Sequence, residues 1–222
     1  MTTGHGHHEH DTPDSMFSEA FWDERYSAST ALWSGNPNPH LVSEAADLAP
    51  GAALDVGCGE GADVIWLAER GWRVTAVDIS SVALQRGAAH AERADADVAQ
   101  HITWLQADLI SWVPPVASFD LVSAQFMHLP KDPREALFGR LAASVAPGGS
   151  LLIVAHHPLD LQTTARRPPR PEMFFTAADV AASLDPDEWD TAVSEARARP
   201  SIDPDGRSIT IHDAVLRAVR KP

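Results

Sequence analysis

The stretch Ala52–Asp63, AALDVGCGEGAD, constrains the fold more than any other part of this 222-residue chain. An apolar run, a glycine-rich turn and an apolar helical pattern follow one another, which predicts a buried parallel strand that leads into a helix. The glycines of the turn are Gly57, Gly59 and Gly61. They can adopt a positive φ and carry no Cβ, so the backbone can approach a ligand closely. A second predicted strand, 73–79, carries Asp78 near its carboxyl end, which predicts a nucleotide-type crevice there.

The spacing of the glycines indicates which ligand the crevice holds. A dinucleotide fingerprint reads G-x-G-x-x-G, but here the third glycine comes one residue early, and the P-loop pattern is absent. Glu60 and Asp63 would repel a pyrophosphate, whereas Asp78 follows Gly57 by about 20 residues, which suits an acid that binds ribose hydroxyls. A ligand with an adenosine, a positive sulfonium and no phosphate fits best. We therefore predict an S-adenosylmethionine site; the alternative is a glycine-rich turn in an ordinary α/β protein.

Charge and composition exclude several classes of partner. The formal net charge of -14 disfavours a nucleic-acid partner. No apolar run approaches the length of about 18 residues that would cross a membrane, so we expect no membrane partner. Cys58 is the only cysteine, which rules out an intrachain disulfide and favours a cytoplasmic location. Within the glycine turn, Cys58 is better explained as a small lining residue than as a nucleophile.

The chain divides into a tail and one domain. Residues 1–15 are predicted to be a disordered His-rich tail; its histidines lack tetrahedral metal-ligand spacing, so we favour a flexible tail over a metal site. These histidines are His5, His7, His8 and His10. The rest, 16–222, is predicted to be a single domain. Its parts are a helical lid segment (16–49), a cofactor-binding core (50–157), and a substrate loop with a terminal hairpin (158–222).

Strand and helix patterns alternate through the core. Strands are predicted at 52–56, 73–79, 102–105, 119–126 and 150–156, with helices at 61–70, 81–95 and 133–146 between them. Two further strands, 190–197 and 208–220, flank the turn sequence Asp203-Pro204-Asp205-Gly206. This order predicts an α/β, doubly wound Rossmann-like sheet that ends in an antiparallel pair, with N-terminal helices ahead of it.

Aromatic residues concentrate ahead of the first strand. Trp22, Tyr26 and Trp33 either cap the core of an added helical layer or close over the cofactor, with a ring face against the sulfonium. Both interpretations stay open and they are compatible. Arg25 either pairs with the carboxylate of the cofactor or is a solvated surface residue.

Taken together, these motifs resemble class I S-adenosylmethionine-dependent methyltransferases over about residues 50–220. The resemblance lies in the G-x-G-x-G turn, the acid that ends the second strand, Gln-Ala-Asp-Leu at 106–109, Phe-Asp-Leu-Val at 119–122 and Pro-Gly-Gly at 147–149. It implies a seven-stranded sheet of order 3-2-1-4-5-7-6 with strand 7 antiparallel. The segments 21–26 and 33–37 are similar to the thiopurine and tellurite-resistance methyltransferases, whose aromatics at these positions wrap the cofactor.

On this basis each site residue is given a predicted role. The backbone around Gly57 and Gly59 approaches the methionine part of the cofactor, and Asp78 binds the ribose. Ile79 flanks the adenine, Asp108 accepts a hydrogen bond from its amino group, and Leu109 packs beside it. Gln125 faces the methionine part and the transferring methyl group. Asp55, Cys58 and Ala107 complete the predicted set of cofactor contacts.

The methyl acceptor is predicted to be a small molecule. No base is evident; His128 is the candidate catalytic residue, and His156 and His157 also follow predicted strands. A thiol or another chalcogen needs little help from a base, which favours such an acceptor or a heteroaromatic nitrogen. The alternatives are O- or N-methylation of a natural-product or quinone-type phenol, and a regulatory protein that binds the cofactor without chemistry. An NAD-dependent oxidoreductase is disfavoured by the glycine spacing and by Tyr26 being the only tyrosine.

Overall fold

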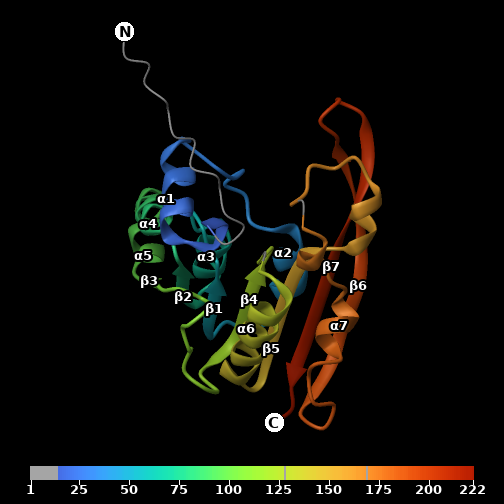
Figure 1. Ribbon diagram of the computed structural model, residues 1–222. Coiled ribbons are helices and arrows are strands. Elements are labelled where there is room, and N and C mark those ends of the chain that lie inside the picture. Colours follow the sequence, from blue (N-terminus) through green and yellow to red (C-terminus); the bar gives the residue numbers. More distant parts are fainter. Residues whose placement is uncertain (1–14, 128, 169) are drawn as a thin grey trace.

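A computed structural model of the chain describes residues 15–127, 129–168 and 170–222. Within them, seven strands form a single sheet of order β3-β2-β1-β4-β5-β7-β6 (Figure 1). All neighbouring pairs are parallel except those of β7, which runs antiparallel to both β5 and β6. The predicted fold class, strand order and antiparallel strand are therefore confirmed. The strands are β1 (Ala52–Val56), β2 (Arg73–Asp78), β3 (Ile102–Gln106), β4 (Phe119–Gln125), β5 (Val145–His156), β6 (Trp189–Ile202) and β7 (Ser208–Arg220).

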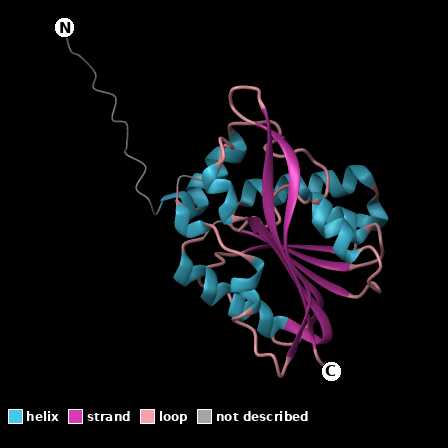
Figure 2. Cartoon of the chain, turned by 90° about the vertical axis from the view of Figure 1, so that its right-hand side faces the viewer, coloured by secondary structure: helices cyan, strands magenta, loops and turns pink. Residues whose placement is uncertain are grey.

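Helices cover both faces of the sheet, which is seen from its side in Figure 2. Strand residues alternate between two buried clusters: Leu54 and Val56 pack with α6 and α7, and Ala53 packs with α2 and α3. Side chains along a strand alternate between the two faces of the sheet, so Asp55 lies on the same face as Ala53, the face that α3 covers. The α-helices are α1 (Glu19–Ser27), α2 (Pro39–Ala45), α3 (Ala62–Ala68), α4 (Ser81–Ala94), α5 (Ala96–Ala99), α6 (Lys131–Ser144) and α7 (Ala177–Ala181). Short 3-10 turns are η1 (Ser15–Phe17), η2 (Pro158–Gln162) and η3 (Pro171–Met173).

Local hydrogen bonds explain where the lid helices begin. Ser18 accepts a hydrogen bond from Phe21 N at 3.3 Å and caps α1, so the first α-helix begins three residues after the start of the predicted lid segment at residue 16. Asn38 caps α2 through His40 N at 2.9 Å, with Pro39 in the first turn. Neither α5 nor the 3-10 turns were expected from the hydrophobic pattern, because four-residue and shorter helices carry too few residues to show a period.

The terminal hairpin is longer than its sequence pattern indicates. β6 continues to Ile202, past the predicted end at 197, because its pairing with β7 keeps one register from Val193 opposite Arg217 to Ile202 opposite Ser208. Pro200 is tolerated since β6 is the edge strand of the sheet. The two strands extend beyond the others in Figure 1, beside the carboxyl ends of β4 and β5. Among the described residues, no helix has the length and apolar character needed to cross a membrane.

Candidate cofactor and acceptor site

The glycine turn after β1 adopts a backbone shape that L-residues with a side chain rarely take. Gly57, Gly59 and Gly61 have φ values of 71°, 53° and 82°. The N–H groups of Gly57 and Cys58 both donate to Val77 O, at 2.8 and 3.1 Å, which folds the turn against the end of β2. A Cβ on Gly59 would lie 2.9 Å from the hydroxyl oxygen of Tyr26. The turn is therefore closely packed, with the Tyr26 hydroxyl directly against Gly59.

Asp78 ties the ends of β1 and β2 together. Its carboxylate accepts the N–H of Gly59 at 2.8 Å and the N–H of Ser80 at 2.9 Å. The side chain is buried, and burial raises its pKa, although the backbone hydrogen bonds act in the opposite direction. Each carboxylate oxygen has a further lone pair available, so Asp78 can accept hydroxyl donors while it holds the turn.

Helix α1 is anchored to the carboxyl ends of β2 and β3 by two of its acidic side chains. Asp23 accepts the hydroxyl of Ser80 at 2.6 Å and the N–H of Val82 at 3.3 Å, which caps α4 from a distant part of the chain. Glu19 accepts the side-chain amide of Gln106 at 2.8 Å, and the same amide donates to Ile79 O at 3.1 Å. The lid segment thus lies across the carboxyl ends of β2 and β3. The sequence predicts that the adenosine of the cofactor binds between these two strand ends.

The three predicted lid aromatics come together at the glycine turn. Trp33 Nε1 donates to the hydroxyl of Tyr26 at 3.0 Å, and the rings of Trp22 and Tyr26 lie 6.1 Å apart. Tyr26 is buried, which raises its pKa well above the usual range. Trp33 is 54% exposed, an unusual position for a tryptophan that only fills a core. The guanidinium of Arg25 lies over the Trp22 ring at 5.4 Å.

Glu60 anchors the lid segment, although the sequence indicated only that its charge would repel a pyrophosphate. Its carboxylate accepts the N–H of Leu32 at 3.1 Å and pairs with Arg86 at 3.1 Å. At the other end of the lid, Glu44 in α2 pairs with Arg197 at 2.6 Å and Arg217 at 3.0 Å on the terminal hairpin. The lid segment is therefore held at the glycine turn by Glu60 and at the terminal hairpin by Glu44. Sequence reasoning missed these anchors because each joins residues far apart in the chain.

Gln125 belongs to a polar chain between the lid and the core. It donates to the hydroxyl of Ser123 at 2.9 Å and accepts the side-chain amide of Asn38 at 3.0 Å. Asn38 also donates its backbone N–H to Asp63 at 2.6 Å. Asn38 and Ser123 were not predicted as site residues. The signal for Asn38 was present, because an Asn before Pro in a helical pattern marks an N-cap, but its contacts depend on the fold.

Two further predicted residues line the floor of the turn. Asp55 is 2% exposed, and burial together with the charges of Asp63 and Asp78 raises its pKa well above the usual range. Burial and the nearby carboxylates also raise the pKa of the Cys58 thiol. A neutral thiol is a poor nucleophile, which agrees with the interpretation of Cys58 as a small lining residue.

At the predicted adenine end, three residues follow β3. Ala107 N donates to Asp78 O at 3.0 Å, which joins this loop to the residue predicted to bind the ribose. Asp108 is exposed and accepts the N–H of Ile110 at 2.9 Å and the hydroxyl of Ser111 at 3.1 Å. Leu109 is buried and packs into the core. Asp108 thus organises its own turn, and its carboxylate oxygens can accept further hydrogen bonds.

An aromatic wall stands at the carboxyl ends of β4 and β5. The ring of His156 lies 4.8 Å from that of Phe126 and 6.1 Å from that of Phe174. Phe126 has a φ of 52°, a left-handed conformation that is costly for a residue with a bulky side chain and that often marks a functional site. Met127 follows it, and a Cβ on Gly57 would clash with the Met127 sulfur. The wall therefore adjoins the glycine turn.

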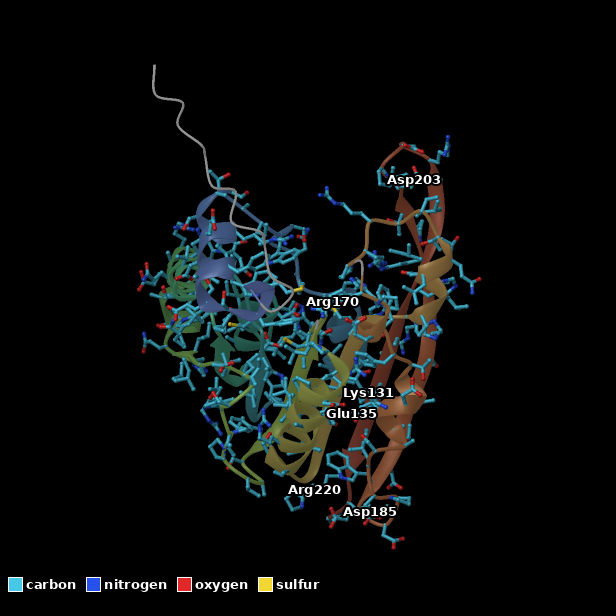
Figure 3. All side chains as sticks on the ribbon, in the orientation of Figure 1. Lys131, Glu135, Arg170, Asp185, Asp203 and Arg220 are labelled. Atoms are coloured by element: carbon cyan, nitrogen blue, oxygen red, sulfur yellow. The ribbon has the colours of Figure 1, made fainter. Side chains whose placement is uncertain are left out.

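An ion pair and hydrogen bonds hold the loop that carries Phe174. Asp160 is buried and pairs with Arg167 at 2.6 Å, and it accepts the N–H of His212 at 2.8 Å. Thr164 donates to Asp203 at 2.8 Å at the tip of the β6–β7 hairpin, where Figure 3 labels Asp203. The Arg170 guanidinium lies 5.9 Å from the Phe17 ring, so this loop also meets the beginning of the lid (Figure 3).

Some predicted residues cannot be placed. His128 and the tail histidines His5, His7, His8 and His10 lie outside the described residues. Within 15–127, 129–168 and 170–222, no group of three or more metal-ligating side chains is arranged to hold a metal ion. His157 caps η2, where its Nδ1 accepts the N–H of Leu159 at 3.2 Å, and burial lowers its pKa.

Comparisons with known proteins agree with this geometry. Residues 53–149 match the family described as a methyltransferase domain. An uncharacterized methyltransferase of Mycobacterium tuberculosis is 39% identical over 123 residues, 54% of this chain and 59% of that protein. Probable thiol methyltransferase 2 of Arabidopsis thaliana is 30% identical over 141 residues, 61% of each protein. Glycine N-methyltransferase of Rattus norvegicus is 35% identical over 136 residues, 55% of this chain and 46% of that protein.

The matched region covers less than two thirds of each of these relatives. A solved structure from work on the conversion of a disulfide bond into a thioacetal group during echinomycin biosynthesis shares the fold along almost the whole chain. Its TM-score is 0.70 at 22% identity, over 91% of this chain and 92% of that one. The left-handed glycines and the acid at the end of β2 fit an adenosine and its methionine part. Residues 53–149 thus match a methyltransferase domain, and the sheet that contains them is shared with a solved S-adenosylmethionine-dependent methyltransferase of Mesorhizobium loti, at a TM-score of 0.58 and 21% identity over 82% of this chain and 96% of that one.

Proposed function

We propose that the protein transfers a methyl group from S-adenosylmethionine to a small molecule whose acceptor atom is a thiol sulfur or another chalcogen. The observation that carries this proposal is the wall of Phe126, His156 and Phe174, with the Met127 sulfur beside Gly57. Apolar and polarizable side chains suit a soft acceptor atom better than a hard, hydrated one. The similarity to a protein named as a probable thiol methyltransferase supports the same acceptor class.

The residues of the crevice divide into those that hold the cofactor and those that exclude water. The cofactor supplies a methyl group already activated on a sulfonium, which leaves as a neutral thioether. Asp78 is proposed to hold the ribose hydroxyls, and Asp108 and Leu109 to contact the adenine. The Tyr26–Trp33 pair lies over the turn at Gly59, where it would shield the reaction from solvent and present a ring face to positive charge.

Catalysis in this proposal rests on positioning. The chain must hold the acceptor atom about 3 Å from the methyl carbon and in line with the leaving sulfur. Thiols ionise near pH 8.5, so a useful fraction is already the nucleophilic thiolate close to neutral pH. The fastened loop that carries Phe174 supports a rigid acceptor wall, since Asp160 and Asp203 hold it against the hairpin.

A heteroaromatic nitrogen is the second candidate acceptor, because the tilted rings of Phe126, His156 and Phe174 offer faces on which a flat heterocycle could stack. The relatives differ in their named acceptors, since one is a glycine N-methyltransferase. The acceptor therefore has to be determined by direct assay.

A screen with labelled S-adenosylmethionine distinguishes these acceptors. We expect methyl transfer to small thiols, selenite or tellurite, with weaker or no transfer to phenols and to glycine. Transfer to aromatic nitrogen alone would replace the proposal with its second candidate. Retained binding of S-adenosylhomocysteine without transfer to any acceptor would indicate a regulatory protein, the remaining alternative.

Replacing His128 with alanine tests the need for a base. For a thiol acceptor at pH 8, we expect the rate to change by less than about threefold, because the acceptor is already partly ionised. General-base catalysis is worth about 10²–10⁴-fold, so a loss of that size would assign the base to His128. The matched control is His101→Ala, an exposed histidine that precedes β3.

A further inference from the structure

His157 and His212 form an imidazole pair at the carboxyl end of β5. His157 N donates to His212 O at 3.0 Å, which continues the β5–β7 ladder one step beyond His156 opposite Asp213. Ala155, two residues before His157, packs with residues of α7, so the imidazole pair lies on the face that α7 covers. The two rings lie 6.4 Å apart, and 26% of the His212 side chain is exposed. The pair is therefore open to a small ligand.

The hydrogen bonds of His157 determine which of its ring nitrogens carries a proton. Nδ1 accepts the N–H of Leu159 at 3.2 Å, so in the neutral ring the proton lies on Nε2. A ring nitrogen that carries a proton donates a hydrogen bond and does not bind a metal ion. Nε2 of His157 therefore presents an N–H group to a ligand.

Asp160 orients the second imidazole. Its side chain is fully buried, and Oδ1 accepts the backbone N–H of His212 at 2.8 Å while lying 3.6 Å from Nδ1 of the same residue. Nδ1 of His212 is buried and has no hydrogen-bond partner among the described residues. A buried polar atom without a partner is rare and calls for an explanation. A proton on Nδ1 that points toward Asp160 supplies one, and it leaves Nε2 of His212 for a ligand.

The charges around the imidazole pair leave it able to bind an anion. Asp160 is already paired with Arg167, whose Nη2 lies 2.6 Å from Oδ2 of the carboxylate. Asp179 in α7 also acts on His157, but its side chain is exposed to solvent. Arg166 is exposed and has no ion-pair partner in the part of the chain that the structure describes. A negative group of a ligand thus meets no unpaired buried carboxylate at this position.

We propose that the imidazole pair binds a carboxylate group carried by the methyl acceptor. This inference rests on the proposed function, because it concerns the acceptor of that same reaction. His157 Nε2–H donates to one carboxylate oxygen. His212 takes up a proton from solvent on Nε2 and donates it to the other oxygen. Since His157 directly follows His156 of the aromatic wall, a short acceptor places its sulfur at the wall and its carboxylate at the pair.

Other polar groups match the imidazole pair less well. An ammonium group has only donors, so it meets the N–H of His157 without an acceptor. A hydroxyl group can accept from His157 and donate to neutral His212, but these are bonds between neutral groups. A hydrogen bond to an ionised group is about twice as strong as a neutral one. We therefore expect the site to prefer a carboxylate over a hydroxyl group, and a hydroxyl group over an ammonium group.

The proposal fixes the sign of a pH dependence. His212 is the ring that takes up the proton, because burial and the neighbouring imidazole lower the pKa of His157. An unperturbed imidazole titrates near pH 6.5 or so, and a bound carboxylate raises that value. We expect the affinity for the carboxylate to fall by up to about tenfold per pH unit above about pH 6.5, with uptake of up to about one proton on binding.

Three small thiols that differ in their terminal group test the selection: 3-mercaptopropionate, 2-mercaptoethanol and cysteamine. At pH 7 we expect the lowest KM for 3-mercaptopropionate. His212→Phe should raise that KM by about 10- to 100-fold, the worth of one hydrogen bond to a charged group, and leave the KM for cysteamine unchanged. His212→Gln keeps a neutral donor and should give an intermediate KM. His101→Phe, which replaces an exposed histidine before β3, is the matched control.

Calorimetry with 3-mercaptopropionate measures the proton without turnover when the protein is saturated with S-adenosylhomocysteine, which has no methyl group to transfer. Runs in buffers of different ionisation enthalpy at pH 7 should show proton uptake for the wild type and none for His212→Gln. This measurement on the wild type needs no variant, so it decides the matter if His212→Phe does not fold.

The outcomes separate this inference from the function on which it rests. Equal KM values for the three thiols would overturn the carboxylate site and leave thiol methylation intact. A preference for 3-mercaptopropionate that persists in folded His212→Phe, or binding without proton uptake, would also overturn it. Transfer to none of the thiols would contradict the proposed acceptor class, whereas proton-linked binding of 3-mercaptopropionate in the same protein would still support the carboxylate site.

Discussion

Replacing Asp78 with alanine is expected to weaken the binding of S-adenosylhomocysteine by about 100-fold or more. A hydrogen bond to a charged group is worth about 1.5–3 kcal/mol, and the variant loses two of them to the ribose. Each 1.4 kcal/mol or so is a factor of about ten in affinity. The loss is compounded because Asp78 also accepts the N–H groups of Gly59 and Ser80, so the turn loses the acceptor that shapes it.

Isothermal titration calorimetry with purified variants measures this loss. The isosteric Asp78→Asn variant keeps one acceptor oxygen and should bind with intermediate affinity, which separates the contacts to the ligand from the shape of the turn. Asp97→Ala, an exposed acid in α5, is the matched control and should bind like the wild type. An unchanged affinity in a folded Asp78→Ala protein would remove Asp78 from the cofactor site.

Most of the fold could be predicted because its signals are local and repeat along the chain. Each core strand is a short apolar run bounded by glycine, proline or polar residues, and the helices between them show a helical period. The order of the strands came from the resemblance rather than from these patterns. The end of β6 was missed because Arg199 and Pro200 do not resemble strand residues, although pairing with β7 keeps them in the sheet.

The positions of candidate site residues at strand ends could be predicted from the sequence. The roles of residues that contact distant parts of the chain could not. Asp55, Gly57 and Asp78 lie at strand ends, where the doubly wound fold places ligands regardless of detail. Glu60 is a residue whose role could not be predicted from the sequence, since its charge indicated only that the site excludes phosphates. Its role in fastening Leu32 arises from a contact between residues 28 positions apart, which no local pattern encodes.

The second large effect is expected from Gly61→Ala, which should destabilise the protein by about 3 kcal/mol. Gly61 has a φ of 82°, and a left-handed conformation costs a residue with a Cβ about 1–2 kcal/mol. The new Cβ would also lie 2.5 Å from Cη2 of Trp104, whose ring fills the space between Gly61 and Gly87. Overpacking of this kind costs about 1–3 kcal/mol. Thermal unfolding should show a Tm lowered by roughly 10 °C for a protein of this size.

Gly139→Ala is the matched control, because Gly139 lies within α6 and a Cβ there would meet nothing within 4 Å. That substitution should raise stability by about 0.5–1 kcal/mol, since alanine loses less conformational entropy than glycine in a helix. Adding Trp104→Leu to Gly61→Ala should recover the packing part of the loss and leave the backbone part, so the double variant divides the effect in two. If the Gly61→Ala variant unfolds at the wild-type temperature, the Trp104 ring does not pack closely against Gly61.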